Sequence, residues 1–223
     1  MEDEDRNLLE YYKLRAKEYE YIYQRDDPVR QAEQLIITDA VRHCFQERNV
    51  LEVACGTGFW TWFLADVANH VTGIDASPEM LEIARKKGIP PHKVSFLVGD
   101  VYDLDSVPGE FNGGLCNFWF SHVPKARIPQ FLEGFHRRLR ANSVVFMADN
   151  MLVPGIGGEL LSKDGEENTF KVRMSSSGAK YEIIKNYYTT DELQRIFEPW
   201  SKDLEVHSGY CFWWVKYMIA KNE

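Results

Sequence analysis

The stretch NVLEVACGTGFWT, residues 49–61, joins an apolar run to a glycine-rich turn. The run has the composition of a buried β-strand, and Gly56, Thr57 and Gly58 follow it directly. A glycine turn after a strand is typical of phosphate-binding sites, but this strand carries one acid, Glu52, and a carboxylate repels phosphate. The sequence therefore indicates a ligand that accepts both a glycine turn and a neighbouring acid.

Composition limits the class of protein. The chain has 223 residues, 44% of them hydrophobic, which is enough for one domain with its own core. The formal net charge of −8 argues against a nucleic-acid partner, because affinity for phosphate backbones comes from clustered Lys and Arg. The four cysteines form no C-x-x-C pair, so neither a metal site nor a disulfide framework is expected. The polar N-terminus and the lack of a long apolar run predict a cytoplasmic protein without a membrane span, and the oligomeric state stays open.

Helices and strands alternate along most of the chain. Helices are expected over residues 5–23 and 28–45, before the first strand. Strands are then expected at residues 49–54, 70–76, 93–100, 111–120 and 143–150. Because the intervening helical segments require crossover connections, the pattern predicts a mostly parallel sheet with helices on both faces.

The pattern changes after residue 150. Residues 168–188 alternate apolar and polar side chains, like two antiparallel strands around a turn at 175–178. Thr190 is expected to cap a further helix, and residues 204–220 to form one long final strand. We expect these strands to add an antiparallel edge to the parallel sheet. His136 and His207 are expected at the surface.

Acids lie at the ends of three consecutive strands: Glu52, Asp75 and Asp100. Ligands of open parallel sheets bind at those carboxyl ends, and Asp75 lies about 20 residues past the glycine turn, where a carboxylate binds ribose hydroxyls. A nicotinamide cofactor fits less well, because Thr61 occupies the third small-residue position of the fingerprint and a pyrophosphate disfavours an acidic site. S-adenosylmethionine has a ribose, an adenine and a cationic arm without phosphate, so it fits both features.

Three stretches carry a family resemblance. VLEVACGTG, VTGIDASPEML and VSFLVGDVYDL, in this order and spacing, resemble the class I S-adenosylmethionine-dependent methyltransferases. The most similar branch is the small-molecule one typified by enzymes of ubiquinone and menaquinone biosynthesis. The segment YYKLRAKEYE of this chain also resembles the N-terminal segment of those enzymes. The resemblance implies a Rossmann-like, doubly wound, mostly parallel seven-stranded sheet with an antiparallel C-terminal edge and an N-terminal helical cap. The parts of this single domain would be the cap (1–47), a cofactor-binding core (48–150), a substrate-side insertion (151–188) and a C-terminal helix and edge strand (189–223).

The resemblance also implies which residues bind S-adenosylmethionine and its product S-adenosylhomocysteine. Asp75 would bind the ribose diol, while Asp100 and the amide of Val101 would bind the adenine. Gly56 and Gly58 would let the backbone pass the methionine arm. The implied cofactor-binding residues are Tyr12, Arg15, Tyr19, Glu52, Ala54, Gly56, Thr57, Gly58, Asp75, Ala76, Met80, Asp100, Val101 and Asn117.

Methyl transfer to a small organic acceptor is the expected reaction. It is a displacement at an activated sulfonium, so positioning and desolvation supply most of the rate, and a base is needed only for a hydroxyl, thiol or protonated amine. His122 is the candidate base. Trp119, Phe120 and Tyr187 are the candidate acceptor-binding residues, and the acceptor is expected to be a flat, mostly apolar ring. The insertion is expected to contribute apolar side chains to this pocket: Phe170, Met174, Tyr181, Tyr187 and Tyr188.

Two other functions stay open from the sequence. One is a nicotinamide-dependent oxidoreductase, which shares the glycine turn and the acid after the second strand. The other is a methyltransferase-like protein that has lost catalysis and serves as a binding module. Binding of the two cofactors, and turnover to S-adenosylhomocysteine, would separate the three functions.

Overall fold

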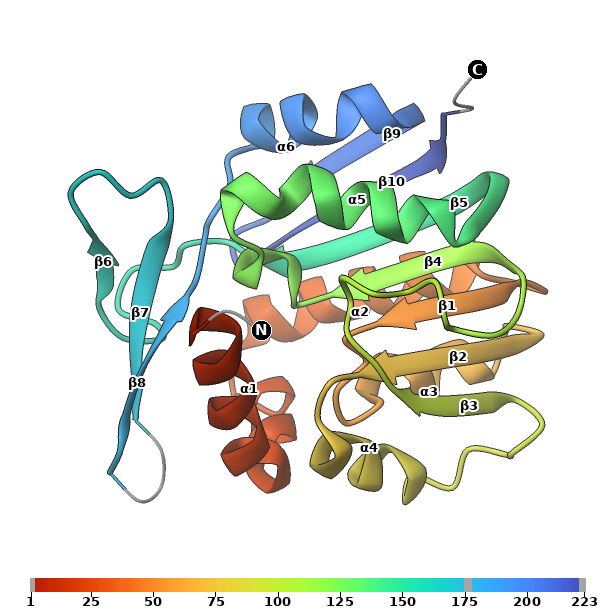
Figure 1. Cartoon of the computed structure of the whole chain (residues 1–223), viewed down its shortest axis with the longest axis horizontal. Helices are drawn as coiled ribbons and strands as arrows, with labels where there is room; N and C mark the ends of the chain where they lie inside the picture. Colours follow the sequence, from red (N-terminus) through yellow and green to blue (C-terminus); the bar gives the residue numbers. More distant parts are fainter. Residues whose placement is uncertain (1–2, 175–177, 221–223) are drawn as a thin grey trace.

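A seven-stranded sheet forms the centre of the protein, in the strand order β3-β2-β1-β4-β5-β10-β9 (Figure 1). The structure, a computed structural model, describes residues 3–174 and 178–220. The strands are β1 (Asn49–Val53), β2 (His70–Asp75), β3 (Val94–Val98), β4 (Phe111–Asn117), β5 (Leu139–Asn150), β9 (Ser201–Ser208) and β10 (Phe212–Ile219). The first five pair in parallel, and β10 runs antiparallel to both β5 and β9. The expected doubly wound sheet with an antiparallel edge is confirmed.

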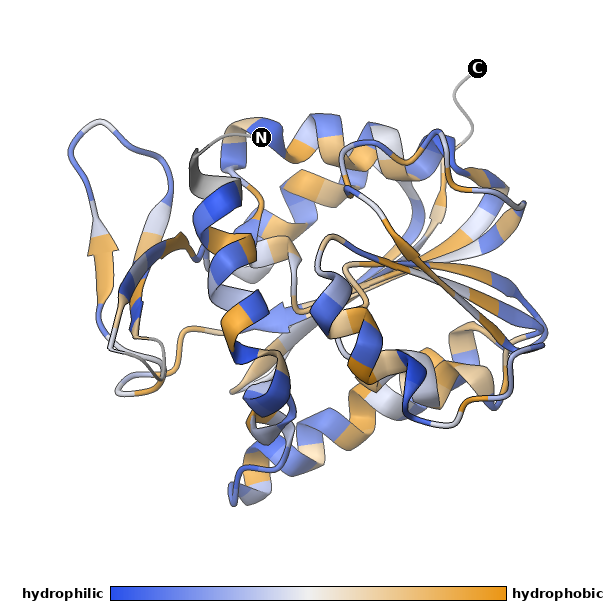
Figure 2. Ribbon diagram, turned by 60° about the horizontal axis from the view of Figure 1, so that its bottom comes forward, coloured by the Kyte–Doolittle hydropathy of each residue, from blue (hydrophilic) through white to orange (hydrophobic). Residues whose placement is uncertain are grey.

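Helices bury both faces of this sheet. Side chains alternate along each strand, so Val50 joins the core under α2 and α3, whereas Leu51 joins the core under α5 and α6. Figure 2 shows orange, apolar residues recurring along the central strands. The α-helices after the N-terminal segment are α2 (Pro28–Cys44), α3 (Phe59–Ala65), α4 (Pro78–Arg85), α5 (Ile128–Arg137) and α6 (Thr190–Phe197). Ser77 caps α4 as expected, because its hydroxyl oxygen accepts from the amide of Met80 at 3.2 Å.

The N-terminal segment is helical but not one α-helix. It begins as α1 (Asp3–Arg15) and continues as the 3-10 helix η1 (Ala16–Tyr23). Short 3-10 turns also occur at η2 (Phe120–His122), η3 (Lys125–Arg127) and η4 (Glu198–Trp200). The segment lies outside the central sheet, where α1 contacts β8 of a second sheet and also α4 (Figure 1).

The second sheet is small and separate from the central one. It has the order β6-β7-β8, from the strands β6 (Leu160–Ser162), β7 (Thr169–Met174) and β8 (Lys180–Ile184). The antiparallel pairing of β7 with β8 is as expected, and part of the expected turn, 175–177, lies outside the described residues. The expectation that these strands extend the edge of the central sheet is wrong, because β10 and β9 occupy that edge.

The C-terminal segment also differs from the expectation of one long strand. It is a hairpin of β9 and β10, and the turn between them is held by Glu33 of α2. The Glu33 carboxylate accepts from the amides of Tyr210, Cys211 and Phe212 at 2.7 to 3.0 Å. A residue far away in sequence therefore stabilises the break between the two strands.

The two histidines expected at the surface differ from each other. His207 is exposed and stacks on Trp214. The expectation is wrong for His136, which is buried and lies 2.8 Å from the hydroxyl of Tyr217 through Nε2. Burial lowers the pKa of His136 to about 4.

Thr189, rather than Thr190, is the N-cap of α6. Its hydroxyl accepts from the amide of Glu192, whose carboxylate accepts from the amide of Thr189 in return, forming a capping box. Thr189→Ala should therefore lower the free energy of unfolding by about 1 kcal/mol in urea denaturation. Thr190→Ala is the matched control, since that hydroxyl hydrogen-bonds to the hydroxyl of Ser208 instead of a helix amide. Equal losses in the two variants would contradict the cap assignment.

Candidate active site

A cavity opens at the carboxyl ends of the central strands, beneath α1 and η1. We call it the first cavity. Its lining includes most of the residues expected around the cofactor: Tyr12, Tyr19, Ala54, Gly56, Asp75, Ala76, Met80, Asp100, Val101 and Asn117. Trp119, expected to contact the acceptor, lines this same cavity. Segments far apart in the sequence thus meet where open parallel sheets bind their ligands.

Asp75 fixes the shape of the glycine turn. One carboxylate oxygen accepts from the amide of Gly56 and the other from the amide of Ser77, both at 2.8 Å. Burial raises the pKa of Asp75, and these two amide bonds oppose the rise. Gly58 ends the turn with φ 73°, and a Cβ added there would lie 3.0 Å from the Cβ of Ala84. The turn therefore requires glycine for both conformation and space.

Asn117 marks a place for a ligand in the first cavity. It ends β4, and both polar atoms of its side-chain amide are buried without a hydrogen-bond partner among the described residues. Such atoms are rare in folded proteins unless a ligand or water supplies the missing partners. The cavity thus combines two acids, a tight glycine turn and an unsatisfied amide, and this combination suits a ligand with ribose, adenine and a cationic arm.

Four of the expected cofactor-binding residues do not line the first cavity. Glu52 is buried behind the turn and accepts from the hydroxyl of Thr61 at 2.6 Å. Thr57 donates to Glu20 of η1 at 2.6 Å and so connects the glycine turn to the helix above it. Gly58 lies at the start of α3, and Arg15 lines a different cavity.

A second cavity adjoins the first, and Tyr12, Tyr19 and Phe118 line both. Its wall is built from α1, η1, the start of α2, the end of β5 and the insertion. Besides the shared residues, its polar and charged lining consists of Tyr11, Arg15, Tyr23, Arg25, Arg30, His122, Asn150, Arg173, Lys185 and Tyr187. His122 and Tyr187, expected near the acceptor, therefore lie together here.

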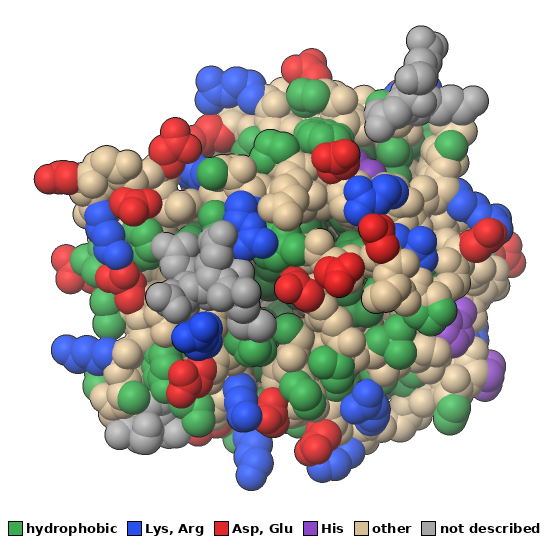
Figure 3. All heavy atoms as spheres, in the orientation of Figure 1, with side chains coloured by type: hydrophobic (Ala, Val, Ile, Leu, Met, Phe, Trp, Pro, Cys, Tyr) green, Lys and Arg blue, Asp and Glu red, His purple; other side chains and the backbone are tan. Residues whose placement is uncertain are grey.

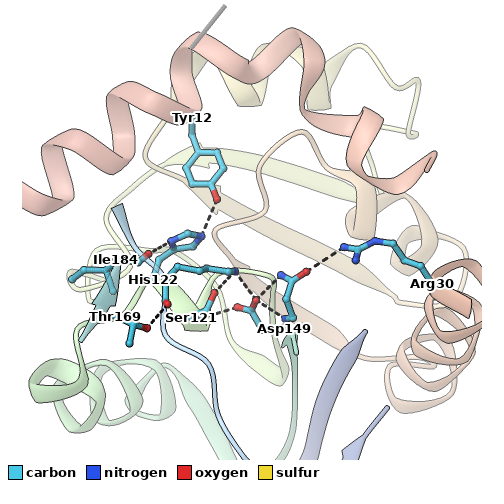
Figure 4. A network of polar contacts seen from close by, with 9 residues as sticks. Tyr12, Arg30, Ser121, His122, Asp149, Thr169 and Ile184 are labelled. Carbon is cyan, nitrogen blue, oxygen red and sulfur yellow. Dashed lines mark hydrogen bonds and ion pairs between the residues drawn. The ribbon is translucent and has the colours of Figure 1, made fainter. Parts of the chain in front are cut away.

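His122 is a neutral hydrogen-bond acceptor toward this cavity. Its Nδ1 lies 2.6 Å from the carbonyl oxygen of Ile184, and because a carbonyl only accepts, Nδ1 carries the proton. Its Nε2 then accepts from the hydroxyl of Tyr12 at 2.8 Å (Figure 4). Burial, together with the charge of Lys185, lowers the pKa of His122 to about 3. Burial raises the pKa of Tyr12, so the phenol keeps its proton.

A buried ion pair underlies the second cavity. Nζ of Lys185 lies 3.0 Å from Oδ1 of Asp149, and both side chains are almost fully shielded from solvent. Lys185 also donates to the hydroxyl of Ser121 at 2.5 Å, and Asp149 accepts from the amide of Ser121 at 2.9 Å. Asn150 continues the network by donating to Asp149 and accepting from Arg30 (Figure 4). Burial opposes ionisation of Asp149, but the charge of Lys185, together with smaller contributions from His122 and the amides of Ser121 and Asn150, lowers the pKa of that carboxyl.

Most of the side chains expected to form an apolar acceptor pocket do not line the two cavities. Phe120 has no exposed surface, and its ring packs in the core against Tyr188, Phe197 and Trp213. It therefore does not line either cavity. Of the five apolar side chains expected from the insertion, only Tyr187 lines the second cavity. The others are buried elsewhere or face outward: Phe170 and Tyr188 are buried, Met174 is exposed, and Tyr181 contacts Glu10.

Known proteins are similar to this chain in fold and in the sequence of its core. Residues 50–142 match the family described as Methyltransferase domain. A demethylmenaquinone methyltransferase of Listeria welshimeri is 28% identical over 176 residues, which cover 76% of this chain and 72% of that protein. Among solved structures, a DhpI-SAM-HEP complex has a TM-score of 0.78 at 22% identity, covering 97% of this chain and 98% of that one. A DhpI-SAH complex has a TM-score of 0.75 at 24% identity, covering 95% of this chain and 94% of that one.

The strand order, the glycine turn with its acids, and the matched core resemble those of class I S-adenosylmethionine-dependent methyltransferases. This chain is an S-adenosylmethionine-dependent methyltransferase. Neither the nicotinamide-dependent oxidoreductase nor the inactive binding module is favoured by these similarities. Within the described ranges, the helices are too short or too polar to cross a membrane.

The buried carboxyl of Glu52, behind the glycine turn, can be tested through the pH dependence of stability. Burial raises its pKa to about 8 from an ordinary 4.5, so the neutral form is the stable one in the folded protein. The stabilisation from the neutral carboxyl is complete below pH 4.5 and is lost as the pH rises through 8. Glu52→Gln, which stays neutral, should therefore gain in free energy of unfolding over the parent as the pH rises across this window. Urea denaturation at several pH values measures the gain, with the exposed Glu18→Gln as a control that changes little. A pH-independent difference for Glu52→Gln would contradict the buried neutral carboxyl.

Proposed function

We propose that this enzyme transfers the methyl group of S-adenosylmethionine to a small organic acceptor bound in the second cavity. The observation that carries the proposal is the pair of adjoining cavities, which share Tyr12, Tyr19 and Phe118. The first cavity would hold the cofactor, and a ligand in the second would lie next to it, since three side chains line both cavities. When bound, S-adenosylmethionine supplies a methyl group made electrophilic by its sulfonium.

The residues that line the first cavity have distinct proposed roles. Asp75 would accept from the ribose hydroxyls, since each of its oxygens has a lone pair beyond the bonds to Gly56 and Ser77. Asp100 and the amide of Val101 would bind the adenine. Asn117 would use its unpaired amide near the sulfonium or the acceptor. Glu52, Thr57 and Gly58 would act indirectly, by shaping the turn that passes the methionine arm.

His122 is the proposed base for an acceptor that must lose a proton. The geometry supports a relay in which the Tyr12 oxygen takes the acceptor's proton while the Tyr12 proton moves to Nε2 of His122. The bond from Nδ1 to the carbonyl of Ile184 keeps Nε2 free of hydrogen and holds the ring in place. The low pKa of His122 means that the imidazole starts neutral throughout the physiological range.

Asp75→Ala tests the cofactor site. The variant should bind S-adenosylmethionine and S-adenosylhomocysteine more weakly by about 1.5–3 kcal/mol, the usual contribution of hydrogen bonds to a charged group. Isothermal titration calorimetry on folded protein measures this. Asp66→Ala is the control, because Asp66 is an exposed acid paired with Arg42 away from the first cavity. Parent-like affinity in Asp75→Ala would contradict the assignment of Asp75 to the cofactor site. A parent protein that binds neither ligand would contradict the proposed function.

His122→Ala and Tyr12→Phe test the relay. A screen with methyl-labelled cofactor first identifies an acceptor, and turnover of that acceptor is then compared. If the accepting atom must be deprotonated, each variant should turn over about 10²–10⁴ times more slowly, and the double variant no slower than the worse single one. Affinity of His122→Ala for S-adenosylhomocysteine should stay unchanged. Loss of that affinity would show that the histidine is structural, and full activity would show that the acceptor needs no base.

A further inference from the structure

The charged side chains that line the second cavity are all cationic. Five cationic side chains line it: Arg15, Arg25, Arg30, Arg173 and Lys185, and the lining contains no Asp or Glu. On the molecular face drawn in Figure 3, by contrast, acidic and basic side chains are interspersed. In a chain with a net charge of −8, such a concentration of cations around one cavity calls for a ligand of opposite charge.

These arginines have no carboxylate partners among the residues that the structure describes. The ion pairs found there include none of Arg15, Arg25, Arg30 or Arg173. Arg30 is 9% exposed, donates to the amide oxygen of Asn150 and lies 4.5 Å from the ring centre of Phe212. Neither contact cancels its charge.

Arg173 of β7 likewise has a neutral hydrogen-bond partner and no carboxylate partner in the described part of the chain. It donates through Nη1 to the carbonyl of Gly157, while its Nε is buried without a hydrogen-bond partner in the described chain. Lys185 has a carboxylate partner, Asp149, which compensates for one positive charge only. Burial lowers the pKa of Lys185, and the charges of Arg173 and Arg30 add to that effect against Asp149. Arg30, Arg173 and Lys185 all line the second cavity.

We propose that the second cavity binds an oxyanion group of the methyl acceptor, of the phosphonate, phosphate or carboxylate kind. Arg30 and Arg173 would be its main ligands, because guanidinium groups present parallel N–H donors that match such oxygens. The proposal rests on the proposed function and names the chemical class of its substrate. It replaces the flat apolar ring expected from the sequence with a small anion.

The carboxylate of the cofactor does not account for these cations. Arg30, Arg173 and Lys185 line only the second cavity, and they come from α2, β7 and the residue after β8. A single carboxylate also cannot neutralise the four arginines that remain besides the paired Lys185. Arg15, near the shared wall, remains available for the methionine arm.

The test is calorimetric titration of the full chain, saturated with S-adenosylhomocysteine, with methylphosphonate, inorganic phosphate and acetate. At least one of these probes should bind, more weakly as the salt concentration rises, and the probe that binds best distinguishes phosphorus oxyanions from carboxylates. Arg30→Gln and Arg173→Gln should each weaken that probe at least about tenfold, the effect of losing one charge-assisted hydrogen bond. Arg42→Gln is the matched control on α2, because Arg42 is paired with Asp66 and lines neither cavity.

The outcomes separate this proposal from the proposed function. Unchanged affinity for S-adenosylhomocysteine in all three variants shows that they are folded, and Arg173→Gln on the small sheet serves if Arg30→Gln does not fold. A parent that binds S-adenosylhomocysteine but none of the probes overturns the oxyanion site and leaves the methyltransferase intact. A probe that binds the protein without S-adenosylhomocysteine but not the saturated protein would assign the cations to the cofactor instead. Equal weakening in the Arg42→Gln control would reduce the binding to non-specific charge attraction and would also overturn the proposal.

Discussion

The buried ion pair between Lys185 and Asp149 determines how the insertion meets the central sheet. The last residue of β8 and the two residues after it dock on η2 and β5. Ile184 binds His122, and Lys185 binds Asp149 and Ser121. The amide of Asn186 donates to the carbonyl of Ser121. Loss of one partner would leave an uncompensated charge in the interior, which typically costs about 3–5 kcal/mol. The orientation of His122, which lines the second cavity, depends on this docking.

The two cavities differ in charge as well as in lining. The first has two acids, Asp75 and Asp100, and the second has five cations. Tyr12, Tyr19 and Phe118 line both cavities and carry no charge when the phenols are protonated. A sulfonium in the first cavity and an anion in the second would each lie in a favourable potential, and the opposite charges would attract each other where the cavities adjoin. Charge complementarity of this kind contributes to orientation before any bond changes.

The sequence predicted the parts of the site that are local. Gly56, Asp75 and Asp100 each lie at the end of a strand or within three residues of it. Because strand ends converge in any parallel sheet, their meeting follows from the strand order alone. Arg30 and Arg173 carry no such signal, because their convergence depends on how α1, α2 and the small sheet pack. The prediction that Phe120 contacts the acceptor fails because a residue just past a strand can point to either layer. Its ring packs in the core against Trp213. The break after β9 depends on Glu33, at a distance in sequence that no local pattern spans.

The division of the site between two parts of the chain affects how function is inferred from relatives. The methyltransferase family match covers residues 50–142, whereas Arg30, Arg173 and Lys185 all lie outside it. Two proteins that agree throughout this matched segment can therefore present opposite charges to their substrates. Transfer of a substrate name between relatives of this enzyme should depend on the residues aligned with these three cations, and agreement in the shared core supports only the identity of the methyl donor.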